Sequence, residues 1–196
     1  HVLFAVIVLF FAPLQFVPQI RSKYKMFHHW NGRLFILSAM ILSLGGIVMT
    51  WVFNTGGGSV FKHLASTLNA LLILAFAGFG LRAAIARQIP QHQVWMTRLF
   101  LAMGGVWFFR IGVMLWIFIH GRPVGFDPDT FSGPFLDTMA FAQFILPLAY
   151  YELYRSISRQ KTPWLVTLFN LCTLVFIALL MLGIFVAFNA LWAPHI

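Results

Sequence analysis

Two short stretches of this sequence combine imidazole, indole and guanidinium side chains in the same order. Residues 28–33 read His-His-Trp-Asn-Gly-Arg, and residues 92–98 read His-Gln-Val-Trp-Met-Thr-Arg. In each, a tryptophan follows the first histidine within three residues, and an arginine follows it after five or six. Imidazole is a standard axial ligand of heme b, and guanidinium binds anionic groups through its fork of donors. If the chain does chemistry, we expect it between these two stretches.

The histidines fall into two candidate pairs. His28 and His92 begin apolar runs that start on one side of a membrane, whereas His1 and His63 begin runs that start on the other side. As two pairs of axial ligands, one near each face, they would form a transmembrane electron path. The alternative is that polar residues collect at helix starts, where water and lipid headgroups satisfy imidazole. That alternative is favoured for the remaining histidines, His29, His120 and His195.

Three arginines lie inside apolar runs. Arg33 and Arg98 lie one to two turns from an end, where a long side chain usually extends to the interface. The alternative is a binding role, in which the two arginines hold an anionic or polar group: a heme propionate, a quinone carbonyl or a lipid phosphate. Arg110 lies roughly 15 Å from the end of its run at the usual helical rise. An arginine at that depth indicates either a binding site or a buried ion pair, for which Asp137 is a candidate partner.

The composition is that of an integral membrane protein. Of 196 residues, 61% are hydrophobic and 9% are charged, whereas soluble domains carry about a quarter charged residues. The net charge of +9 does not indicate a nucleic-acid partner, because the charges lie in short links between apolar runs. The single cysteine, Cys172, excludes an internal disulfide. No catalytic triad, zinc-protease motif or carboxylate pair supports hydrolysis.

The fold class predicted is all-α, a polytopic transmembrane bundle forming one integral-membrane domain over residues 1–196. A span needs about 20 mainly apolar residues. Six runs meet this description, at residues 1–18, 27–53, 61–86, 92–119, 135–154 and 163–192. Because the chain begins at His1 within an apolar run, we expect a seventh helix before it. Pro13 interrupts the first run, and the carbonyl that it frees needs a polar partner such as Gln15.

Two glycine pairs lie within the runs, Gly45-Gly46 and Gly104-Gly105. In membrane helices, small residues allow close helix packing. They would also leave room for a flat cofactor against the backbone. Close packing is the commoner reason for such pairs.

The basic residues are distributed unequally. Only Lys62 and Arg122 lie near one face of the predicted bundle. Ten lie near the other face: Arg21, Lys23, Lys25, Arg33, Arg82, Arg87, Arg98, Arg155, Arg159 and Lys161. This asymmetry predicts that the second face is cytoplasmic, in a bacterial inner membrane.

The order of these motifs resembles a family. The residues that carry the resemblance are His1-Val2, Pro13-Leu14-Gln15-Phe16, Arg21, residues 28–33, His92, Trp95-Met96, Arg98 and Arg110. This pattern resembles a bacterial membrane family catalogued as domain of unknown function 2306. Ala12 stands where the pattern favours glycine. The resemblance covers the first part of the chain, up to the link that begins at Gly121, and implies a membrane fold without naming a reaction.

A second resemblance concerns residues 28–32. They are similar to the His-Ser-Trp-x-Gly heme-ligand stretch of ascorbate-dependent transmembrane b cytochromes. This likeness implies heme b ligation by His28 with His92, and by His1 with His63.

Two classes of function remain open. The first is a b-type cytochrome-like or quinone-interacting electron-transfer protein, with His28 and His92 as axial ligands and Arg33 and Arg98 holding anionic groups. The second is a non-catalytic accessory subunit that packs on a larger membrane complex and binds lipid or pigment. A transporter that uses Arg110 is a third reading, but transporter sites favour paired broken helices, and the sequence shows no such pairing.

Overall fold

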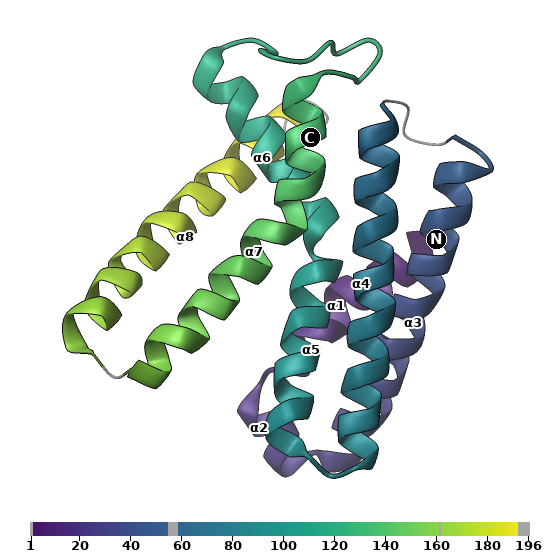
Figure 1. The fold of residues 1–196 in the computed structure, drawn as a ribbon, viewed down its shortest axis with the longest axis vertical. Helices are drawn as coiled ribbons and strands as arrows, with labels where there is room; N and C mark the ends of the chain where they lie inside the picture. Colours follow the sequence, from purple (N-terminus) through teal and green to yellow (C-terminus); the bar gives the residue numbers. More distant parts are fainter. Residues whose placement is uncertain (1, 55–58, 161, 192–196) are drawn as a thin grey trace. The chain divides into compact units, whose positions relative to one another are not determined.

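The computed structural model describes residues 2–54, 59–160 and 162–191. Within these ranges the regular structure is helical, apart from one isolated bridge between Asp127 and Ser132, which confirms the all-α prediction. The helices are α1 (Val2–Leu14), α2 (Pro18–Lys23), α3 (Lys25–Trp51), α4 (Val60–Ile85), α5 (Ile89–Met103), α6 (Gly105–His120), α7 (Pro134–Gln160) and α8 (Pro163–Leu191), as Figure 1 shows.

The chain divides into two compact units. Unit 1 consists of residues 1–56 and 63–103 and holds α1, α2, α3, α5 and most of α4. Unit 2 consists of residues 57–62 and 104–196 and holds the start of α4 together with α6, α7 and α8. The two expected histidine-to-arginine stretches both lie in unit 1.

Three of the described helices are long and apolar enough to cross a bilayer: α3, α4 and residues Pro163–Ala190 of α8. A fourth candidate is the pair α5 and α6, which meet at a bend of 44°. The expectation of six spans is therefore not confirmed. Helix α7 has the length of a span but is not among the candidates.

The expected continuous span over residues 92–119 is broken at Gly104, between α5 and α6. Glycine weakens a helix by about 1 kcal/mol relative to alanine, and two adjacent glycines stand here. In a continuous helix the Ala102 carbonyl would accept a hydrogen bond from the amide four residues later, and the break removes this donor. The buried amide of Asn69 on α4 donates to that carbonyl at 3.2 Å, so the broken end is capped by a side chain.

The expected first span, residues 1–18, also differs in the structure. Helix α1 ends at Leu14, because the amides of Gln15 and Phe16 turn back onto the Ala12 and Pro13 carbonyls. Pro18 then begins the short helix α2, a position where its missing N–H costs nothing. With 13 residues, α1 is shorter than the roughly 20 that a bilayer needs.

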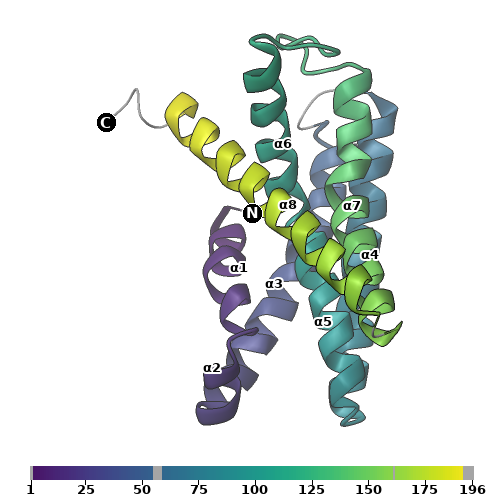
Figure 2. The ribbon, with the colours of Figure 1, turned by 90° about the vertical axis from the view of Figure 1, so that its left-hand side faces the viewer.

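The core of unit 1 combines large and small side chains. Phe35 and Leu99 are fully buried, and they pack with the small residues Ala12, Ala39 and Ala77. Helix α1 packs on α3, as Figure 2 shows. Small residues at such contacts allow helix backbones to approach closely, which is how membrane helices gain packing energy. These contacts hold the starts of α3 and α5 at one end of the unit.

Unit 2 is held together mainly by helix contacts of α6 with α7 and α8. Gly183 on α8 lies so close to α6 that an added Cβ would stand 2.5 Å from the Ile111 Cγ2. The link 121–133 folds back on α6, where the Trp116 indole donates to the Val124 carbonyl at 2.9 Å and stacks on Phe135 at 4.6 Å.

Candidate functional site

His92, near the start of α5, is oriented by a backbone contact. Its Nδ1 lies 2.9 Å from the carbonyl oxygen of Gly80 on α4. A carbonyl can only accept, so Nδ1 carries a proton, and in the neutral ring Nε2 is then the nitrogen with the lone pair. Gly80 is buried, and a Cβ there would lie 3.0 Å from the Met96 Sδ. The glycine therefore permits the close approach of α4 and α5 that this hydrogen bond needs.

His28 stands at the corresponding end of α3. Its side chain is half-buried, and its Nδ1 is buried without a hydrogen-bond partner among the residues that the structure describes. His29, His92 and Arg21 lie near enough to its ring to interact with it electrostatically. Figure 1 shows that the starts of α3 and α5 lie at the same end of unit 1. The structure thus brings together His28 and His92, whereas the adjacent His29 is exposed.

Two amide side chains join the end of α1 to the start of α3. The Gln15 Nε2 donates to the His28 carbonyl at 3.3 Å, and the Asn31 Nδ2 donates to the Phe11 carbonyl at 2.9 Å. Both side chains are buried. A Cβ at Gly32 would lie 3.3 Å from the Gln15 Oε1, so this glycine makes room for the first amide. The reciprocal bonds fix the backbone that carries His28.

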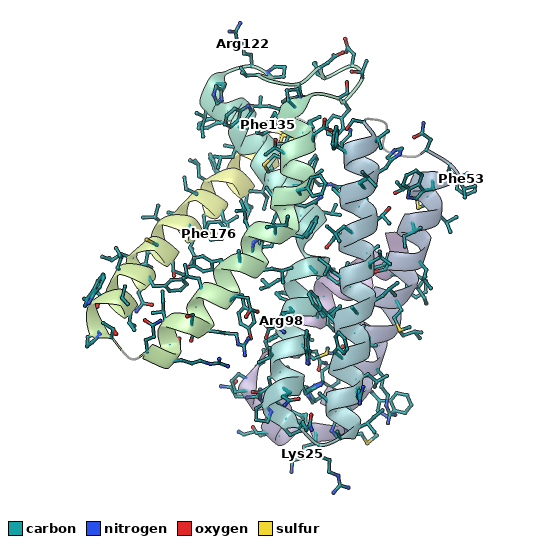
Figure 3. The ribbon with its side chains drawn as sticks, viewed as in Figure 1. Lys25, Phe53, Arg98, Arg122, Phe135 and Phe176 are labelled. Carbon is teal, nitrogen blue, oxygen red and sulfur yellow. The ribbon has the colours of Figure 1, made fainter. Side chains whose placement is uncertain are left out.

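Each histidine is followed by a stacked tryptophan–arginine pair. The Arg33 guanidinium lies 5.1 Å from the centre of the Trp30 ring on α3, and the Arg98 guanidinium lies 4.4 Å from that of Trp95 on α5. In Figure 3, Lys25 marks the end of unit 1 where α3 begins, and Arg98 lies further into the unit. Both arginines therefore lie near the histidines in sequence and on the same helices, with their charge on an aromatic face.

His63, near the start of α4, contacts the side chains of Trp51 and Thr67. Its ring meets Trp51 edge-on at 5.5 Å, and its Nε2 is buried without a partner in the described part of the chain. The Thr67 hydroxyl links the two residues, since it accepts from the Trp51 indole and donates to the His63 carbonyl, both at 2.8 Å. His1, its expected counterpart, lies outside the described residues, as does His195. His120 bonds the Trp116 carbonyl at 2.9 Å, in agreement with a structural role.

The expected burial and pairing of Arg110 are wrong. Its side chain is exposed on α6, and within the described ranges no ion pair holds it. Asp137, the candidate partner, instead accepts a hydrogen bond from the Ser59 hydroxyl. The sequence spacing gave the depth of Arg110 along its helix but not the direction in which the helix turns it.

A second polar cluster, Ser59, Lys62, Phe131 and Asp137 in unit 2, was missed by the sequence analysis. Lys62 is only 8% exposed. Its ammonium donates to the Phe131 carbonyl, lies 4.9 Å from the centre of the Phe131 ring and is attracted by Asp137. The signal available was a lysine within the first turn of an apolar run. The cluster ties the start of α4 to the link 121–133.

That link is also ordered by Asp127. Its carboxylate accepts from the Asp129 amide at 2.9 Å and from the Thr130 hydroxyl at 2.8 Å. These two hydrogen bonds favour the charged form and hold the pKa of Asp127 below its usual value. The turn therefore shapes the loop.

The described residues contain no group of three or more histidine, cysteine or acidic side chains placed to hold a metal ion. A protein-only metal centre is therefore not formed by them. What His28 and His92 can offer is two axial nitrogens to a metal whose other ligands come from a macrocycle.

Comparison with known proteins identifies the family of the chain. No curated protein and no solved structure matches the chain. The family model described as "Predicted membrane protein (DUF2306)" matches residues 1–146, which include both histidine-to-arginine stretches. Since that match covers most of the 196 residues, the chain belongs to the membrane protein family called domain of unknown function 2306.

Proposed function

We propose that this protein is a b-type cytochrome-like electron carrier of the membrane, in which His28 and His92 bind heme b from α3 and α5. The observation that carries the proposal is the hydrogen bond from the His92 Nδ1 to the Gly80 carbonyl, 2.9 Å long. A ligating histidine characteristically donates its second ring N–H to a carbonyl or carboxylate, which fixes the ring and raises the basicity of the ligating nitrogen.

His28 supplies the second imidazole of the proposal. Its buried Nδ1 has no partner in the described ranges, and a buried polar atom left unpaired costs about 1–3 kcal/mol. Ligation by either ring nitrogen, with a hydrogen bond at the other, would remove that cost. Gln15 and Asn31 support this role, because their hydrogen bonds hold the start of α3 in place.

The charges of unit 1 favour an anionic ligand. The four acidic residues of the chain are Asp127, Asp129, Asp137 and Glu152, and none belongs to unit 1. Unit 1 therefore offers Arg33 no carboxylate, whereas heme b carries two propionates. Guanidinium suits carboxylate through paired N–H donors. In this proposal the heme supplies one-electron chemistry, and the chain supplies ligation, burial and charge compensation.

The same proposal includes an orientation. The end of unit 1 that holds His28 and His92 would face the cytoplasm of a bacterium, because the sequence predicts ten basic residues near that face and two near the other. Labelling of Ser22→Cys and Ser59→Cys from outside intact cells, in a Cys172→Ser background, tests it. Labelling at position 59 alone is expected, and labelling at position 22 alone would reverse the orientation.

An absorption spectrum of the purified protein tests the heme itself. Reduction of a bis-imidazole heme b gives sharp visible bands, so the full-length protein should show a reduced-minus-oxidised difference spectrum. His28→Ala and His92→Ala should each abolish it, while His29→Ala, a change one residue away on an exposed side chain, should keep it. A protein without bound heme when heme is supplied during expression would favour the accessory-subunit alternative.

A further inference from the structure

Helix α2 presents basic side chains beside the start of α3. It is six residues long, none of them buried, and Arg21 and Lys23 lie in its last turn. Lys25 follows as the first residue of α3 and, with Arg21 and Lys23, is exposed. Figure 3 places Lys25 at the extreme end of unit 1. Three cations are therefore displayed within five residues of chain, next to a candidate membrane span.

Nothing in unit 1 neutralises these charges. Unit 1 contains no aspartate or glutamate but seven basic residues: Arg21, Lys23, Lys25, Arg33, Arg82, Arg87 and Arg98. Two of them, Arg82 in the last turn of α4 and Arg87 in the turn that follows, lie where α4 reaches the same end of the unit as α2 (Figure 1). Like charges gathered without acids repel one another, so the surface is most stable when anions from outside the chain screen it.

Three apolar or aromatic side chains between and after these cations are also exposed. Tyr24 is 64% exposed, Met26 is 75% exposed and Trp30 is 61% exposed. Tyrosine and tryptophan favour the level of lipid headgroups, where one end of the ring is apolar and the other is wet. A soluble anionic protein would leave these apolar side chains in water, whereas a membrane interface accommodates both the rings and the charges.

We infer that the α2 surface, made of Arg21, Lys23, Tyr24, Lys25 and Trp30, is a binding surface for anionic phospholipid headgroups. The cations bind the phosphate and any charged headgroup oxygen, and the aromatic rings lie among the upper acyl chains. Clusters of basic residues beside a membrane helix gain about 1 kcal/mol per residue from an anionic leaflet, which is about fivefold in affinity each. The inference does not depend on heme binding.

Native mass spectrometry of the full chain with equimolar phosphatidylglycerol and phosphatidylcholine tests it. The unaltered protein should retain phosphatidylglycerol preferentially. Arg21→Gln, Lys23→Gln and Lys25→Gln should each lower that preference several-fold, and the triple change should lower it tenfold or more. Arg122→Gln, a matched loss of one exposed cation in the link 121–133, should leave it within about twofold, since neither α2 nor α3 is altered.

Two results would overturn the inference. One is equal retention of the two lipids by the unaltered protein. The other is a preference that Arg122→Gln lowers as much as the α2 variants do, because the effect would then follow net charge and not this surface. Arg21→Lys should keep the preference, which separates loss of charge from loss of folding if the triple variant is unstable.

Discussion

His92 on α5 donates a hydrogen bond from Nδ1 to the carbonyl of Gly80 on α4, 2.9 Å away. The two residues are twelve apart in sequence and meet because α4 and α5 run antiparallel through a short turn. This hydrogen bond fixes the orientation of the His92 ring. The opposite ring nitrogen, Nε2, therefore faces a fixed direction. This relationship makes Gly80, and not only His92, part of the candidate site.

Gly80→Ala should weaken that arrangement. The added Cβ would lie 3.0 Å from the Met96 Sδ and 3.6 Å from the Trp95 Cβ, so the Met96 side chain, which packs between α4 and α5, must move by a few tenths of an ångström. Overpacking of this kind costs about 1–3 kcal/mol. Thermal unfolding followed by circular dichroism in detergent should show a lower midpoint.

Gly46→Ala provides the matched control. Gly46 lies within α3, and nothing stands within 4 Å of a Cβ there. Alanine favours the helix over glycine by up to about 1 kcal/mol, so this midpoint should stay equal or rise. Equal losses in both variants would show that any glycine replacement is harmful, and the packing argument for Gly80 would fail.

Asn31→Ala should destabilise unit 1. Asn31 is 4% exposed, and its amide is the donor to the Phe11 carbonyl at 2.9 Å. The hydrogen bond is part-buried, and removing the partner of a buried polar group costs about 1–3 kcal/mol, which is the upper range for this carbonyl. Denaturant unfolding should detect this loss, while Asn170→Ala, on an exposed residue of α8, should change stability by less than about 0.5 kcal/mol. An Asn31→Ala variant as stable as the unaltered protein would contradict a stabilising role for the hydrogen bond from Asn31 to Phe11.

Lys62→Met should loosen the link 121–133. Methionine keeps an apolar stem of similar length but loses the hydrogen bond to the Phe131 carbonyl and the contact with its ring. Hydrogen bonds to charged groups contribute about 1.5–3 kcal/mol. Limited proteolysis should cleave the link faster than in the unaltered protein. Arg122→Met, in the same link but exposed, should be cleaved at the original rate; acceleration in both variants would argue against an anchoring role for Lys62.

Much of the fold follows from apolar runs and their breakers. The predicted runs 27–53, 61–86 and 163–192 differ by one or two residues from α3, α4 and α8, because each run is long, unbroken and bounded by polar links. The breaks at Leu14 and Gly104 are less predictable. Proline and glycine weaken a helix, yet whether it breaks depends on side chains of neighbouring helices, such as Asn31 and Asn69, that donate hydrogen bonds to the freed carbonyls.

The candidate site was predictable to a similar degree. Parallel spacing from His28 to Arg33 and from His92 to Arg98 indicated two helix starts at one face, and in the structure both starts lie at one end of unit 1. The role of Gly80 was not predictable, since an acceptor carbonyl has no side-chain signature. For Arg110, the position along the helix was predictable by counting residues. The exposure of its side chain on α6 was not, because it depends on how α6 packs.

Electron paramagnetic resonance of the oxidised protein tests heme ligation by His28 and His92 most directly. Two imidazole ligands give a low-spin ferric signal, so the unaltered protein and His29→Ala should both show it. His28→Ala or His92→Ala should convert it to a high-spin signal or remove it, because one axial ligand is lost. A low-spin signal that survives in both of those variants, or no heme signal from protein expressed with heme supplied, would contradict the account.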